Sequence, residues 1–387
     1  MTMTSASTPS TMTFPKLTLI ALVAFAAITP MALLVAPALA AQLGMELGIG
    51  PSEIGTYFFV ENGAFSAASL LSLFWLGRAN VRTVGLVALA VFIAGNLATP
   101  LVLPDYTNLL LIRAFTGFGG GTLMVLSMVS GQDAGNPDRV FGYWVVGQLV
   151  AGAIGLFLLP YFFAGFGLKS FYLALGMLTL LLSPLYRGFL APTASAAATS
   201  KSGTDNGFVL VAILTIAAIL TFYVAIGGVW TFASMAATQA GLAPESIGGI
   251  LAVASLFGIA GAMLATWLAG RSGRRAMLLL GYAILVLSVA GLALLTGGTA
   301  YIVAVCAFKF AWTFVLPFII AEVAGRDPSG KLLASTTLII GTGLSIGPLF
   351  AGLLLGAAWS LSSVFIAAAL CGVISLACLF VPPKSQA

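Results

Sequence analysis

The chain contains no histidine and carries little charge. Of its 387 residues, 6% are charged and 60% are hydrophobic, and the mean hydropathy is +1.14. Soluble domains carry about 25% charged residues, because water must solvate their surface. A surface so poor in charge requires lipid as its solvent, so the composition excludes an ordinary water-soluble protein.

The scarcity of cysteine excludes further kinds of site. Cys306, Cys371 and Cys378 are the three cysteines, and all lie within apolar runs. A disulfide framework or a Cys/His metal centre is therefore not expected, and neither is an enzyme, because the sequence offers no His/Cys set and no paired carboxylates. A glycine-rich nucleotide loop with its lysine is also missing. We therefore expect no metal, no other cofactor and no ATP hydrolysis by this chain.

Long apolar segments recur along the whole chain. A helix needs about 20 apolar residues to cross a hydrocarbon core about 30 Å thick, whereas barrel strands alternate over about 10 residues. Segments that fit helices lie near residues 17–43, 53–76, 83–103, 107–130, 140–163, 169–189, 207–235, 246–270, 276–296, 299–324, 332–356 and 359–382. The sequence predicts an all-α polytopic membrane protein with 12 transmembrane helices.

The first segment has a second interpretation as a signal peptide. The sequence VAPALAAQ at residues 35–42 is similar to a small-residue cleavage site. However, the apolar stretch before it is longer than the roughly 7–15 residues typical of a signal peptide. We expect this segment to be retained as a transmembrane helix.

The distribution of basic residues predicts the topology. With the N-terminus in the cytoplasm, only Lys169 lies in an outer loop, while the outer loops carry Glu46, Glu53, Asp105 and Glu245. The cytoplasmic basic residues are Lys16, Arg78, Arg82, Arg139, Arg187, Lys201, Arg271, Arg274, Arg275, Arg326, Lys331 and Lys384. Positive charge accumulates on the cytoplasmic side of membrane proteins. We therefore expect a multi-pass protein of the bacterial inner membrane with both termini cytoplasmic, and no nucleic-acid partner.

An internal repeat divides the chain into two halves. The motif beginning at Pro51 (PSEIG) recurs at Pro244 (PESIG), an offset of 193 residues (244 minus 51), and the same offset pairs Arg82 with Arg275. Because six helices are an even number, the halves are parallel repeats, an arrangement that suits alternating access. The predicted parts are a tail (1–16), a six-helix bundle (17–189), a linker (190–206), a second six-helix bundle (207–382) and a short tail (383–387).

Three motifs resemble the major facilitator superfamily of secondary transporters. Residues 270–275 (GRSGRR) are similar to the family's loop after the second helix of a half, residues 113–121 (RAFTGFGGG) to its fourth-helix motif, and residues 341–348 (GTGLSIGP) to a Gly-Pro motif. The resemblance covers essentially the whole chain and implies two six-helix bundles. It also implies gating loops that contain Arg78, Arg82, Arg271, Arg274 and Arg275. The family's loop aspartate is replaced by Gly77 and Gly270.

Three ionisable residues lie well inside predicted spans. Glu61, Arg113 and Lys309 lie roughly 12, 9 and 15 Å from the outer helix ends, at 1.5 Å per residue. A charge at such depth costs about 2.5–3.5 kcal/mol and faces protein or a wet cavity. One interpretation is a structural ion pair between Glu61 and Arg113. The other makes Arg113 and Lys309 substrate-binding cations and Glu61 a proton carrier, since burial favours the neutral carboxyl group while a nearby arginine favours the carboxylate.

Polar and aromatic residues in the spans complete the candidate site. Trp312 lies one helical turn from Lys309 and therefore on roughly the same face. Each of these residues also has a packing interpretation, because aromatic and polar side chains commonly join helices. The candidate substrate contacts are Arg113, Lys309, Gln148, Trp230, Trp312, Tyr223 and Asn62.

These features favour a secondary transporter. Channels carry rings of like charge or filter loops, which are not evident here. The net positive interior favours a small organic anion, carried by proton symport. The alternative is a proton-coupled drug or metabolite efflux antiporter, against which the missing Gly-Pro motif in the fifth helix argues. The expected partners are the solute, protons and the lipid bilayer, and we expect a monomer.

Overall fold

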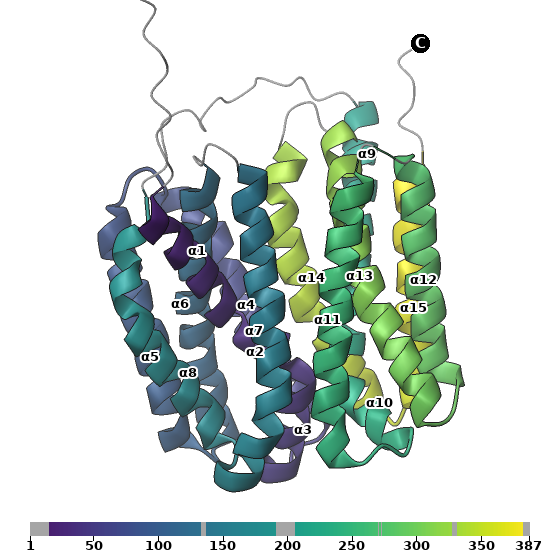
Figure 1. The fold of residues 1–387 in the computed structure, drawn as a ribbon, viewed down its shortest axis with the longest axis horizontal. Helices are drawn as coiled ribbons and strands as arrows, with labels where there is room; N and C mark the ends of the chain where they lie inside the picture. Colours follow the sequence, from purple (N-terminus) through teal and green to yellow (C-terminus); the bar gives the residue numbers. More distant parts are fainter. Residues whose placement is uncertain are drawn as a thin grey trace, which may run out of the picture.

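The computed structural model describes residues 15–132, 137–190, 206–269, 271, 273–326 and 331–381. Every regular element within these ranges is a helix (Figure 1). Most of the predicted N-terminal tail and linker, together with the C-terminal tail, lies outside the described residues.

Most of the helices follow the predicted segments, although those near 17–43 and 207–235 are each divided. The first half contains α1 (Lys16–Ile28), α2 (Met31–Leu34), α3 (Ala36–Leu47), α4 (Pro51–Trp75), α5 (Val81–Val102), α6 (Tyr106–Gln132), α7 (Pro137–Phe166), α8 (Lys169–Leu182) and the 3₁₀-helix η1 (Ser183–Gly188). The second half contains α9 (Asn206–Thr231), α10 (Ala233–Gln239), α11 (Pro244–Leu268), α12 (Arg274–Leu294), α13 (Gly298–Arg326), α14 (Lys331–Gly356) and α15 (Leu361–Phe380).

Ten helical segments of the described chain are long and apolar enough to cross a membrane. The 25-residue helix α4 is long enough as well, but it carries Glu53, Glu61 and Asn62 and is less apolar. Pro30 and Pro37 interrupt the first predicted span, because proline lacks an N–H donor and its ring clashes with the preceding turn. The segment near 17–43 is therefore not one continuous helix but the series α1, α2 and α3.

The ends of the molecule are distinguished by their loops. We call the end where α4 and α11 begin the far end, and the end where α1 begins and α15 ends the near end. In Figure 1 the far end, with α3 and α10, lies at the bottom, and the near end lies at the top. The purple-to-teal helices of the first half and the green-to-yellow helices of the second half lie side by side (Figure 1).

The two halves contact each other chiefly through α4 with α14 and α7 with α11. The backbones of α4 and α14 approach closely, since a β-carbon on Gly352 would lie 3.0 Å from the Cα of Gly55. The Ser52 hydroxyl donates to the Gly352 carbonyl at 3.3 Å, and deeper in the molecule Ser345 donates to the Phe59 carbonyl at 2.9 Å. Small residues permit this approach, so the halves are joined from the far end to the middle of the bundle.

Candidate functional site

An ion pair between Glu61 and Arg113 lies in the interior of the first half. Arg113 on α6 has no exposed surface, and Glu61 on α4 is 7% exposed. The Arg113 Nη2 atom donates to Glu61 Oε1, while Glu61 Oε2 and Arg113 Nε are buried without a partner. The two residues that the sequence analysis considered as a pair are therefore in direct contact.

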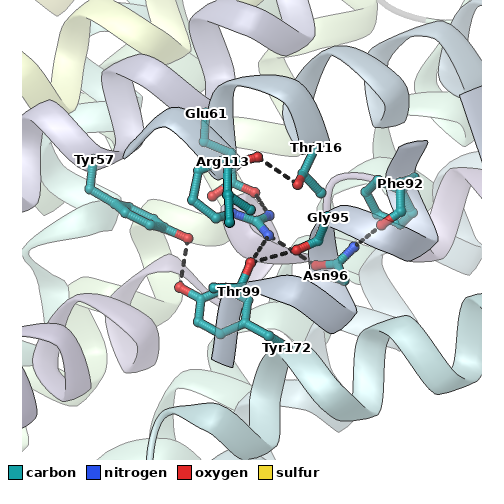
Figure 2. A network of polar contacts seen from close by, with 10 residues as sticks. Tyr57, Glu61, Phe92, Gly95, Asn96, Thr99, Arg113, Thr116 and Tyr172 are labelled. Atoms are coloured by element: carbon teal, nitrogen blue, oxygen red, sulfur yellow. Dashed lines mark hydrogen bonds and ion pairs between the residues drawn. The ribbon is translucent and has the colours of Figure 1, made fainter. Parts of the chain in front are cut away.

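Further contacts fix the arginine in place (Figure 2). Its Nη1 atom donates to Asn96 Oδ1 at 3.0 Å and lies 3.4 Å from Thr99 Oγ1. Asn96 and Thr99 are three residues apart on α5 and so share one face of that helix. The guanidinium carbon lies 4.9 Å from the ring centroid of Tyr172, whose hydroxyl is 2.9 Å from that of Tyr57.

Lys309 of α13 is buried in a different way. The residue is 3% exposed, and its Nζ atom lies 4.1 Å from the ring centroid of Trp230 and 4.2 Å from that of Trp312. Within the described parts of the chain, no carboxylate forms a salt bridge with this ammonium group. An ammonium is attracted to the faces of indole rings, but two rings supply no negative charge. Lys309 is thus a buried cation without a counter-ion.

The two cations occupy separate surroundings. The partners of Arg113 lie on α4, α5 and α8, whereas the rings that contact Lys309 lie on α9 and α13 itself. The structure therefore places one buried cation in each half and does not bring Arg113 together with Lys309. Of these two buried cations, Arg113 has a carboxylate partner, and Lys309 has none among the described residues.

The other predicted site residues are more scattered. Tyr223 is buried on α9, two turns from Trp230 on the same helix. Asn62 Nδ2 lies 3.5 Å from the Leu344 carbonyl, across the contact between α4 and α14. Gln148 is half-buried on α7, one of the helices that joins the halves. The structure thus places Trp230 and Trp312 against Lys309, with Tyr223 two turns from Trp230, while Asn62 lies at the contact between the halves.

The predicted gating arginines are exposed at the near end. Arg78 and Arg271 each donate to a carbonyl near the end of the preceding helix, at 3.4 and 2.7 Å. Arg274 forms an ion pair with Glu322 of α13 at 3.6 Å. Arg82 and Arg275 are the second residues of α5 and α12. In this loop motif Gly270 replaces the family's aspartate. Glu322, which lies on another helix, instead provides the carboxylate that pairs with Arg274.

Sequence reasoning missed several of these partners. Asn96 and Thr99 are polar residues within an apolar run. Buried polar side chains need hydrogen-bond partners, so their positions in the sequence could have indicated a buried polar contact. Glu322 also pairs with Arg326 at 3.1 Å, four residues later on α13. Arg326 in turn donates to the carbonyls of Cys378, at 3.4 Å, and Leu379 at the end of α15. The spacing of Glu322 and Arg326 predicts their pairing, but not the bonds to α15.

Solved structures with a similar fold are transporters. A mutant of the nucleoside transporter NupG has a TM-score of 0.74 at 12% identity, over 94% of this chain and 99% of that chain. Unmutated NupG has a TM-score of 0.70 at 13% identity, over 96% and 100%. A bacterial homologue of the human lysosomal transporter Spinster, in an inward-facing and unoccupied conformation, has a TM-score of 0.70 at 14% identity, over 97% of each chain. At these identities the likeness shows the fold alone.

Sequence comparison identifies the family. No curated protein sequence matches this chain significantly. The family model for the Major Facilitator Superfamily, however, matches residues 17–328, which is most of the chain. This match agrees with the helical fold and with the resemblance in the loop and fourth-helix motifs. The chain therefore belongs to the Major Facilitator Superfamily, and it is a multi-pass membrane transporter and not an enzyme.

Proposed function

We propose that this transporter carries a small organic anion across the inner membrane together with protons. The two six-helix bundles alternate between states that open to one side of the membrane and then to the other. The observation that carries this proposal is Lys309, a buried ammonium held between two indole rings with no carboxylate partner among the described residues.

The surroundings of Lys309 favour an anionic substrate on energetic grounds. A buried cation without a counter-ion is unfavourable, and attraction to indole rings offsets only part of its desolvation. The carboxylate of a bound substrate supplies the missing charge. Trp312, which is only half-buried, is placed to contact the remainder of such a molecule.

Glu61 is the proposed proton carrier. Its Oε2 atom is buried and has no hydrogen-bond donor, so a proton added there meets no competing donor. Protonation removes the negative charge opposite Arg113 and leaves two interior cations, Arg113 and Lys309, without a carboxylate. A more positive interior binds an anion more tightly. By thermodynamic linkage, a bound anion in turn increases the affinity of Glu61 for its proton. Proton and anion therefore travel in the same direction.

The positive-inside distribution supports the proposed orientation. The exposed arginines at the near end support a cytoplasmic location for that end and for both termini. The far end then faces outward, and the contacts of Ser52 and Gly55 with α14 close that side. We therefore assign an inward-facing state to this conformation, like that of the Spinster homologue.

Proteoliposomes containing a pH-sensitive dye test the proposal. Benzoate and succinate serve as organic anions, ethidium as a lipophilic cation, and uridine as a neutral solute of the class carried by NupG. The variants are Glu61→Gln and Lys309→Ala, with Lys169→Ala as a control because Lys169 is an exposed lysine outside the site.

The expected result is proton uptake driven by an anion, lost in both site variants and retained in Lys169→Ala. Proton movement opposite to ethidium, with none driven by the anions, would instead establish the efflux antiporter and remove the role given to Lys309. Uridine uptake that is unaffected by Lys309→Ala would also overturn the anion assignment.

A further inference from the structure

Pro37 in the first span deprives the Leu33 carbonyl of its usual helical donor. In a continuous helix the carbonyl of Leu33 accepts a bond from the N–H of residue 37. Residue 37 is proline and has no N–H. The chain ends α2 at Leu34 and begins α3 at Ala36. Inside a bilayer such a carbonyl must find another donor.

The donor comes from the opposite half. The Nε1 atom of Trp230 on α9 donates to the Leu33 carbonyl at 3.1 Å. Trp230 has no exposed surface, and it is the same residue whose ring lies 4.1 Å from Lys309 Nζ. The repeat offset of 193 residues, carried back from Pro244 and Pro51, pairs Trp230 with Pro37. At this position of the repeat, the first half has Pro37, which has no N–H to donate, and the second half has Trp230, which donates a hydrogen bond through its indole N–H.

We propose that Trp230 is a positioning residue that links Lys309 to the contact between the halves. One rigid indole binds the lysine through its face and the first half through its edge. A shift of the ammonium toward a bound anion therefore acts on the same ring that holds Leu33. With the site empty, the ring holds the halves in the far-end-closed state. This role rests on the proposed function, because it takes Lys309 as the anion contact.

The hydrogen bond makes a measurable contribution to the closed state. Loss of one net hydrogen bond changes an equilibrium about 2- to 10-fold. Trp230→Phe retains an aromatic face for Lys309 but removes the N–H. Pro37→Ala gives Leu33 a helical donor that competes with the indole. Lys309→Ala removes the cation that holds the ring, so all three variants weaken the same link.

Thiol labelling of the full-length protein measures how often α4 and α14, which form the seam between the halves, separate. Nanodiscs are used because both faces of the membrane are then accessible. The reporter is Ser345→Cys, since Ser345 is 2% exposed and bonds to α4. The background substitutions are Cys306→Ala, Cys371→Ala and Cys378→Ala. The matched control is Trp144→Phe, because its indole donates to Ser127 at 3.3 Å and both residues lie in the first half.

We expect labelling about 2- to 10-fold faster in Trp230→Phe, Pro37→Ala and Lys309→Ala, and unchanged in Trp144→Phe. Adding Pro37→Ala or Lys309→Ala to Trp230→Phe is expected to increase the labelling rate no further, because all three variants act on one link. A purely structural role would give additive effects with matching losses of thermal stability. Labelling equal to that of Trp144→Phe in both Trp230→Phe and Pro37→Ala would overturn the link.

Transport separates this inference from the proposed function. Loss of anion-driven proton uptake in Lys309→Ala, with normal labelling in Trp230→Phe, keeps the proposed function and overturns the link. Faster labelling in Trp230→Phe and Pro37→Ala, with full transport in Lys309→Ala, supports the bond between the halves and overturns the anion assignment.

Discussion

At the residue scale, the interior accommodates charge in two different ways. Arg113 is surrounded by an acid, an amide and a hydroxyl, so its charge is compensated within the first half. Lys309 contacts two indole faces and no acid among the described residues. The first arrangement keeps its charge balanced as long as Glu61 is ionised. The second leaves a charge that a bound anion can neutralise.

The ion pair gives a prediction about stability. Glu61→Gln leaves Arg113 buried without its counter-charge, and breaking such a pair costs about 3–5 kcal/mol. Adding Arg113→Met to Glu61→Gln removes the orphaned charge and recovers part of this loss. Thermal unfolding of the purified protein measures both effects. A double variant less stable than Glu61→Gln alone would contradict the pairing.

At the element scale, close approach of α4 and α14 joins the two halves. A β-carbon on Gly352 would meet backbone atoms of Pro51 and Gly55 rather than a flexible side chain. Backbone atoms cannot rotate away from the added β-carbon as a flexible side chain can. The helices α4 and α14 must therefore move apart. These glycines are therefore required by the closed far end and not by the folding of either helix alone.

Gly352→Ala is accordingly expected to open the far end. The thiol introduced by Ser345→Cys labels faster in this variant, and anion-driven proton uptake slows because the closed state is depleted. Gly249→Ala is the control, since Gly249 lies on α11 with no atom within 4 Å of an added β-carbon. Equal labelling of the two variants would show that the seam tolerates the extra atom.

The sequence predicts the helices better than it predicts their contacts. Apolar length is a local property, so the positions of most spans follow from it, and the spacing of Lys309 and Trp312 places both on one face. The pairing of Arg113 with Asn96, or of Trp230 with Leu33, depends on the rotation and depth of separate helices. Those are set by packing between helices, which no local pattern encodes.

At the scale of the whole molecule, the distribution of charge and the contact between α4 and α14 correspond to one state of the transport cycle. The far end is closed by contacts between the halves, while the near end carries exposed arginines. If the near end is cytoplasmic, the substrate leaves toward the cytoplasm from this conformation, as uptake requires. Whether this conformation is the inward-facing or the outward-facing state thus depends on the orientation of the chain in the membrane.

Single thiols at the two ends measure this orientation directly. Asp105 lies at the far end and Ala79 at the near end, and both are exposed. In intact bacterial cells, a membrane-impermeant reagent is expected to label Asp105→Cys at once and Ala79→Cys only after permeabilisation, because positive charge remains on the cytoplasmic side. The cysteine-free background controls for other thiols. The reverse pattern would place the closed far end in the cytoplasm, and this conformation would then be outward-facing.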